Sequence, residues 1–363
     1  MKPTSRLATL GLLASLSLPL QGADEQILNV YNWFEYIAPD TIENFEKETG
    51  IRVNYTTFDS MELVETKLLT GQSGYDLVML AGGNLEKVYP TGALAPIQRE
   101  RLGNYANLDP QILAALSAHD PANRYGVPYT WGTTGLAYER AELASRLPGV
   151  ATDDLALLLD PQYASVLAEC GIAMIDAPEE VLGIVLNYLG EDPYSDDPVV
   201  LKRAESTLMA IRPYITHMST GQIIDDLANG NICLALTWSG EAALASVRAE
   251  EVGKGVEVVF EVPRQGSVIW FDSMVIPKDA THPELAHRFI DYILKPQVMA
   301  DITNSMYFAN GNRAARAHVD PEILSDPGIY PPAALMERLF AAKAMGVSQT
   351  RDRNRLWRNF KKG

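Results

Sequence analysis

Aromatic residues, most of them close to a carboxylate, mark three places where the sequence predicts the end of a strand. These residues are Trp33 with Tyr36, Trp238 with Glu241, and Trp270 with Asp272. Carboxylates make charge-assisted hydrogen bonds with ammonium groups, and aromatic faces cover methylenes and attract cations by about 0.5 to 2 kcal/mol each. The combination is typical of a site for a flexible alkyl ammonium. A tryptophan beside a solvated acid is also common in an ordinary packed core.

Motifs for catalysis or phosphate binding are absent from the sequence. It contains no G-x-S-x-G elbow, Walker A loop, H-E-x-x-H pair or G-x-G-x-x-G fingerprint. Acidic residues are abundant, so counting does not exclude a carboxylate pair for glycoside hydrolysis, but nothing marks out such a pair. We therefore expect a binding protein that is not an enzyme and needs no cofactor.

The N-terminus, residues 1–23, reads as a secretory signal. Lys2 and Arg6 form a short basic region, and the apolar stretch Leu7 to Leu20 is too short to span a bilayer comfortably. Ala23 is a suitable small residue for cleavage, and an uncleaved anchor is the alternative. No later stretch reaches about 18 consecutive apolar residues, so we expect an exported, soluble chain.

The charge balance excludes some partners. The 363 residues include 46 Asp and Glu against 30 Lys and Arg, a formal net charge of -16. Removing the signal takes away two cations and no anions, which leaves 28 against 46, or -18. Such a surface repels phosphate backbones, so we expect no nucleic-acid binding. It suits a cationic partner and also serves solubility.

One basic patch opposes this acidity, at the C-terminus. It contains Arg351, Arg353, Arg355, Arg358, Lys361 and Lys362 around Trp357 and Phe360. We expect an amphipathic terminal helix packed on the acidic body; binding of an anionic partner is the alternative.

The only cysteines are Cys170 and Cys233. In an oxidising compartment, such a pair indicates one structural disulfide, and two buried free thiols are the alternative. We expect no metal site, because the five histidines show no metal-ligand spacing to either cysteine.

Strands and helices alternate in the first part of the chain. We predict strands at 27–33, 51–58 and 75–80 and helices at 39–49 and 60–70. This alternation predicts an α/β lobe with a parallel sheet. Ligands of such sheets bind beyond the carboxyl ends of the strands, where residues 33–36 and 81–84 stand.

The pattern restarts after a cluster of Pro, Gly and Thr at 128–134. We predict further strands at 171–175, 232–238, 256–263 and 268–277, and helices from Pro178, at 284–294 and at 296–305. The length is too great for one compact core. Two lobes joined by chain crossings, a hinge arrangement, account for both features.

Many segments resemble the periplasmic polyamine-binding proteins of ABC importers. The matching stretches include YNWFEYIAPDT (31–41), FDSMELVETKL, GYDLVM, PYTWGTTGLAY (128–138), CGIAMIDAPEEV (170–181), DDLANGNICLALTWSGE (225–241), WFDSMVIPKDA and FANGNRAA. They keep their order and cover nearly the whole chain after the signal. The resemblance implies a two-lobed α/β fold of the type II periplasmic binding proteins, with mixed five-stranded sheets and two hinge crossings.

The resemblance also implies approximate lobe boundaries. After the signal peptide at 1–23, the first lobe would comprise 24–129 and 249–296, and the second 130–248 and 297–363. The disulfide of the family maps to Cys170 and Cys233.

Site residues follow from the resemblance, position by position. They are Trp33, Phe34, Tyr36, Ala81, Glu180, Trp238, Glu241, Trp270, Asp272 and Phe308. An acid like Asp272 would grip one amine or an inner nitrogen, Glu241 would grip an end, and Trp270 would stack on the chain. Structural alternatives exist: Glu180 near a helix start also favours the helix dipole, Trp238 can cover a sheet end, and Tyr36 can pack between lobes.

Four positions depart from the usual family pattern. Phe34 and Ala81 stand where Ser is usual, Phe308 where Tyr is common, and Glu241 where Asp is usual. Each lost hydroxyl removes a hydrogen bond of about 0.5 to 1.5 kcal/mol to an amine that used it. The departures make the pocket drier and put the identity of the ligand in question.

The sequence thus predicts a periplasmic solute-binding protein that captures spermidine or putrescine between two lobes and delivers it to an ABC permease. We expect a monomer. The alternatives are the same fold binding another cationic amine or an amino acid, and a partner of a membrane sensor. A carboxylate ligand would need an Arg or a helix terminus, and the matched positions offer no Arg.

Overall fold

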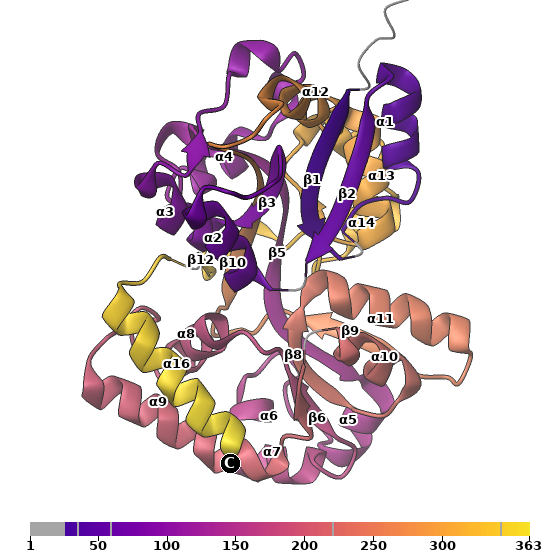
Figure 1. Cartoon of the computed structure of the whole chain (residues 1–363). Helices are drawn as coiled ribbons and strands as arrows, with labels where there is room; N and C mark the ends of the chain where they lie inside the picture. The colour runs from indigo at the N-terminus through magenta and orange to yellow at the C-terminus, as the bar shows by residue number, and fades with distance from the viewer. Residues whose placement is uncertain (1–25, 35, 59, 220, 342) are drawn as a thin grey trace, which may run out of the picture.

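A computed structural model describes residues 26–34, 36–58, 60–219, 221–341 and 343–363. The predicted signal peptide and its cleavage point lie outside these residues. Within them, no helix combines the length and the apolar character needed to cross a membrane. The described chain forms an upper and a lower lobe (Figure 1).

The elements alternate much as predicted, and their bounds are as follows. The first third contains β1 (Ile27–Trp33), α1 (Thr41–Thr49), β2 (Arg52–Phe58), α2 (Met61–Thr70), β3 (Leu77–Ala81), α3 (Gly82–Val88), β4 (Leu94–Ala95) and α4 (Pro110–Leu116). The middle contains β5 (Gly126–Glu139), α5 (Arg140–Arg146), α6 (Ala156–Leu159), α7 (Pro161–Leu167), β6 (Ile172–Met174), α8 (Pro178–Tyr188), α9 (Pro198–Ile211), β7 (His217–Met218), α10 (Gln222–Asn229), β8 (Leu234–Trp238), α11 (Ser239–Val252) and β9 (Val258–Glu261). The last third contains β10 (Val268–Pro277), α12 (Pro283–Ile293), α13 (Pro296–Met306), β11 (Ala309–Asn310), α14 (Pro321–Ser325), α15 (Ala333–Met336), β12 (Phe340–Ala341) and α16 (Val347–Lys362).

Asp-Pro pairs begin four of these helices, and in three of them the aspartate side chain caps the first turn. The side chains of Asp109, Asp160 and Asp197 accept hydrogen bonds from backbone N–H groups in the first turns of α4, α7 and α9. In each helix the next residue is proline, whose fixed φ suits the first helical position. The start of each helix is therefore set locally by the sequence.

Two mixed sheets of five strands share β5. In the first, the order is β2-β1-β3-β10-β5, with β1 parallel to β2 and β3, and β10 antiparallel to β3 and β5. In the second, β5 pairs antiparallel with β9 and β8, and β6 lies parallel to β8 and β7. The expected mixed, two-lobed α/β fold is confirmed.

Strand β5 crosses from one lobe to the other (Figure 1). All of its residues are buried, including the run 128–134 that the sequence analysis interprets as a break. Pro128 pairs with Ser273 at a register shift in β10, and such an irregularity tolerates a proline inside a sheet. Breaker residues therefore mark a bulged crossing strand here, and β10 provides the second crossing.

Each lobe has its own hydrophobic core. The first core is built from buried residues within 28–131 and 269–329, and the second from residues within 136–268 and 356–360. After Ile329 the chain crosses once more to place α16 on the second lobe.

The residues that form the two cores do not follow the expected lobe boundaries. Residues 297–329 belong with the first core, because Met299 and Ile302 of α13 are buried there and β11 pairs with the first-lobe half of β5. Val258 and Val268 belong with the second core, since β9 pairs with the other half of β5. Sequence periodicity located the elements and did not reveal which core each one faces.

The terminal helix α16 packs against α8 and α9, as expected from its basic and aromatic residues (Figure 1). Phe360 is fully buried, and the Trp357 indole donates to Asp176 at 2.7 Å. The guanidinium of Arg353 is buried and donates to the backbone oxygens of Pro193 and Ser195. The tail is thus an integral part of the second lobe.

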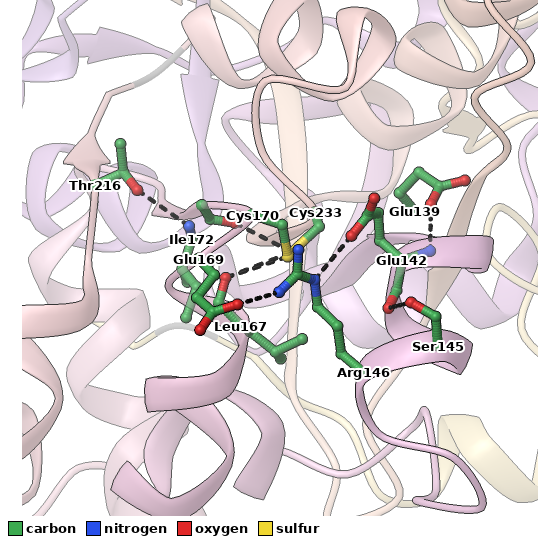
Figure 2. The surroundings of a disulfide bond; sticks show 11 residues. Glu139, Glu142, Ser145, Arg146, Leu167, Glu169, Cys170, Ile172, Thr216 and Cys233 are labelled. Carbon is green, nitrogen blue, oxygen red and sulfur yellow. Dashed lines mark hydrogen bonds and ion pairs between the residues drawn. A yellow bond between two sulfur atoms is a disulfide. The ribbon is translucent and has the colours of Figure 1, made fainter.

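Cys170 and Cys233 form a disulfide, which confirms the expected pairing (Figure 2). Cys233 is buried in the second core, directly before β8. Arg146 of α5 lies beside the bond and pairs with Glu142 and Glu169. The bridge joins residues 63 positions apart and ties the end of α7 to the start of β8.

Removing this bridge should destabilise the protein. Closing a loop of this length removes conformations from the unfolded chain, so the double variant Cys170→Ser/Cys233→Ser should lose about 2 to 4 kcal/mol of unfolding free energy. Urea denaturation measures the loss, and reduced wild-type protein should match the variant. Equal stability of the variant and the oxidised wild type would contradict the structural role.

Candidate functional site

The three predicted acids come from three different elements. Asp272 lies in β10 next to the end of β3, where it pairs with Ala81. Glu180 and Glu241 lie in the first turns of α8 and α11. Those helices follow strands β6 and β8, so the carboxyl ends of the strands position the acids, as the topology rule predicts.

Asp272 is only 6% exposed. Burial and, less strongly, the charge of Glu180 raise the pKa of its carboxyl, the Tyr36 hydroxyl and the nearby Trp33 indole act to lower it, and the net result is a pKa of about 7. Ionisation of the Asp272 carboxyl is therefore energetically unfavourable in this environment.

Glu180 accepts two side-chain hydrogen bonds on the same oxygen. Thr134 Oγ1 lies 2.6 Å from Glu180 Oε2, and Trp238 Nε1 lies 3.0 Å from it. Burial raises the pKa of Glu180, and these two donors lower it in part. Trp238 therefore does more than cover the end of a sheet: it holds an acid.

Glu241 accepts a hydrogen bond from Thr237 Oγ1 at 2.5 Å. Burial raises the pKa of Glu241 to about 7; Thr237 and the backbone N–H of Gly221 lower it, and the charge of Glu180 raises it. Glu180 thus interacts with both other acids, which makes the three one electrostatic cluster. No Lys or Arg of the described chain is among the groups that shift their pKa values.

Aromatic rings surround the acids. Phe308 meets Tyr36 and Trp270 edge to face, with ring centroids 5.6 Å and 5.2 Å apart. Trp33 lies against Phe58, with centroids 4.5 Å apart. Trp238 donates to Glu180, and Tyr36 acts on Asp272, so aromatic residues lie beside two of the three carboxylates.

Two glycines let the rings approach the backbone. A Cβ atom on Gly240 would lie 2.3 Å from the Phe308 ring, and one on Gly132 would lie 2.5 Å from Trp270. Neither distance is possible for a real Cβ atom, so a larger residue would displace the ring. Because Phe308 belongs to the first core and Gly240 to the second lobe, this contact joins the lobes.

The site lies between the two cores. Trp238 and Trp270 pack against both. An ion pair also bridges the lobes, from Lys87 Nζ of α3 to Glu179 Oε1 of α8 at 3.3 Å. The lobes are therefore in contact around the acids.

Two predicted site residues contribute no polar side-chain atom to the acid cluster. Phe34 is 67% exposed at the end of β1, and its backbone N–H bonds the carbonyl of Phe58. Ala81 is half-buried opposite Asp272 and brings no polar atom of its own side chain. The role of Phe34 in binding stays a prediction.

Sequence reasoning missed the polar and small residues that support the acids. Thr134, Thr237, Gly132 and Gly240 all lie in stretches that carry the family resemblance, PYTWGTTGLAY and LTWSGE. A threonine at a fully buried strand position was the available signal, because its hydroxyl needs a partner. Lys87 gave no signal, since its partner is distant in sequence.

Comparison with known proteins places this geometry in a family. The family model of bacterial extracellular solute-binding proteins matches residues 40–331. The chain belongs to this family. It is 41% identical, over 97% of its own length and 96% of the relative, to the putrescine-binding periplasmic protein PotF of Escherichia coli (strain K12).

Other members of the family support the assignment. A putrescine/agmatine-binding protein of Pseudomonas aeruginosa is 38% identical over 99% of this chain and 97% of the relative. Among solved structures, the substrate-binding protein PotD of the Streptococcus pneumoniae spermidine/putrescine ABC transporter aligns with a TM-score of 0.78 and 29% identity, covering 93% of this chain and 99% of that one. In the described part of this solute-binding protein, no group of three or more His, Cys, Asp or Glu is placed to hold a metal ion.

The acid cluster should make the free protein less stable as the pH rises. A folded-state pKa above the unfolded value means that the folded form holds its proton more tightly, so stability is lost between about pH 4.5 and 7. Glu241→Gln removes this cost and should raise the unfolding free energy at pH 8 by on the order of 2 kcal/mol, with a smaller gain at pH 5. Urea denaturation at both pH values measures the difference.

The control is Glu251→Gln, an exposed acid on the same helix. It should change stability little at either pH. A loss of stability in Glu241→Gln at pH 8 would contradict the account of a desolvated, uncompensated carboxylate.

Proposed function

We propose that this solute-binding protein captures a short aliphatic polyamine, such as putrescine or spermidine, between its lobes. The observation that carries the proposal is the cluster of Asp272, Glu180 and Glu241, desolvated together among aromatic rings. A polyamine supplies the cations that make the ionised acids favourable. Its methylenes fit against Trp33, Trp270 and Phe308.

Closure of the lobes follows from the same contacts. Asp272 and Phe308 belong to the first lobe, and Glu180 and Glu241 to the second. A cation held by acids of both lobes binds the closed form more tightly than the open form. Ligand binding therefore shifts the population toward closure.

The comparisons support this ligand class. The relatives named above bind putrescine, or putrescine and agmatine, and they match nearly the whole chain. Agmatine joins an ammonium to a guanidinium, so another cationic amine is the second candidate, and the departures at Phe34, Ala81, Glu241 and Phe308 are the reason to test it. We further propose that the chain works as a monomer in the periplasm and delivers the amine to an ABC permease.

Calorimetry with putrescine, spermidine, agmatine and γ-aminobutyrate tests the proposal. The polyamines should bind stoichiometrically at pH 8, whereas the amino acid should not, because its carboxylate would meet three acids. Asp272→Ala and Glu241→Ala should each weaken polyamine binding about 10- to 100-fold, the effect of losing a hydrogen bond to a charged group.

Glu251→Ala is the matched control on α11 and should bind like the wild type. If both Asp272→Ala and Glu241→Ala keep wild-type affinity, the site is wrong. A response to γ-aminobutyrate alone would overturn the ligand class and leave the fold assignment intact.

A further inference from the structure

Two of the three acids are held in place by threonine hydroxyls. Thr134 Oγ1 donates to Glu180 Oε2 at 2.6 Å, and Thr237 Oγ1 donates to Glu241 Oε2 at 2.5 Å. Both threonines are fully buried. These are short contacts between a hydroxyl and a carboxylate, as expected when the acceptor is ionised.

The two threonines come from neighbouring strands. Thr134 lies in β5, the strand that crosses between the lobes, and Thr237 lies in β8. The register places Thr134 opposite Trp238 and Thr237 opposite Gly135, so the two threonines stand in successive cross-strand pairs of one sheet, whose side chains leave opposite faces. A β-branched side chain in a buried strand has few accessible rotamers, so these hydroxyls are held in fixed positions.

The side chains of the two acids have more rotational freedom than those of the threonines. Glu180 and Glu241 lie in the first turns of helices, and each carries its carboxylate on a side chain with three rotatable bonds. Both hydrogen bonds to Glu180 end on Oε2, so Oε1 is the oxygen that can accept from a ligand. A hydrogen bond to the charged form also lowers the pKa, which keeps a buried acid closer to ionisation.

A simpler explanation of these two bonds is that each buried threonine hydroxyl needs a hydrogen-bond partner. Burial in this strand does not by itself bring a hydroxyl to a carboxylate, because Oγ1 of the neighbouring Thr133 is buried and has no hydrogen bond to an acid of the described chain. The bonds of Thr134 and Thr237 go to the two second-lobe acids of the proposed site.

We propose that Thr134 and Thr237 are positioning residues that orient Glu180 and Glu241 toward the ammonium groups of the ligand and favour the ionised acids. The inference rests on the proposed function for the identity of the ligand. The orientation and ionisation of the acids belong to the free protein and do not depend on that identity.

The test compares Thr134→Val and Thr237→Val with Thr133→Val as the matched control. Each valine keeps the shape and removes the hydroxyl. In the free protein, carboxyl carbon resonances of labelled glutamate, assigned with Glu180→Gln and Glu241→Gln, report the titration of each acid. Thr134→Val should raise the pKa of Glu180, and Thr237→Val should raise that of Glu241, while Thr133→Val leaves both unchanged.

Calorimetry with putrescine supplies the second measurement. Thr134→Val and Thr237→Val should each weaken binding about tenfold, the effect of one lost hydrogen bond to a charged group, and the loss should be greater at pH 6.5 than at pH 8. Thr134→Ser and Thr237→Ser keep the hydroxyl and should restore most of the affinity. Thr133→Val should bind like the wild type.

The outcomes separate this inference from the proposed function. Unchanged titration of Glu180 and Glu241 in the two valine variants overturns the inference, whether or not a polyamine binds. Normal putrescine affinity in both variants, or an equal loss in Thr133→Val, also overturns it and leaves the proposed function standing. Shifted titrations in a protein that binds no polyamine would support the orienting role and overturn the proposed function.

Discussion

The desolvation of three neighbouring carboxylates, with Asp272 buried and Glu180 and Glu241 half-buried, is the constraint on which this structure depends. Water is the usual solvent for such charges, and the described chain replaces it in part with two threonines, the Trp238 indole and the Tyr36 hydroxyl. These groups stabilise the charges only in part, which is why the pKa values of Asp272 and Glu241 rise to about 7. A multiply charged amine supplies the missing positive charges. Because the acids belong to both lobes, the bound amine also stabilises the contact between the lobes.

The fold makes this constraint possible by crossing strands between two separate cores. Strand β5 carries polar groups for both walls, since Thr130 bonds Tyr36 on the first-lobe side and Thr134 bonds Glu180 on the second. Strand β10 brings Trp270 and Asp272 to the same place. The crossing strands thus act as both the connection between lobes and the framework of the site, whereas the disulfide and α16 stabilise the second lobe.

Many of the strands and helices could be predicted from local sequence patterns. The features that could not be predicted depend on contacts between segments distant in sequence. The strands at 27–33 and 268–277 were predicted with the bounds that the structure gives, because β-rich runs ended by turn residues carry a local signal. Pro128 was misread, since a proline in a bulged crossing strand looks like a break until its partner strand is known. The lobe to which residues 297–329 belong could not be predicted either, because the local sequence pattern does not show which core a helix packs against.

Glu241 and Asp272 were predicted from the tryptophans beside them, and the family resemblance added Glu180; the environment of the three acids was not predicted. Nothing in the spacing of Asp272, Glu180 and Glu241 indicates that one of them interacts with the other two, or that threonines hold two of them. These properties arise where segments distant in sequence meet. A departure such as Phe34, predicted to change the pocket, proved to be exposed at the end of β1, and its effect on a ligand is still a prediction.

The most direct measurement of the central claim is the proton balance of polyamine binding at pH 7. Calorimetry of putrescine binding in two buffers with different ionisation enthalpies gives the number of protons exchanged. Acids with pKa values of about 7 in the free protein must ionise fully beside an ammonium, so binding should release protons to the buffer. Putrescine binding with the same heat in both buffers would contradict the account, as would the absence of binding.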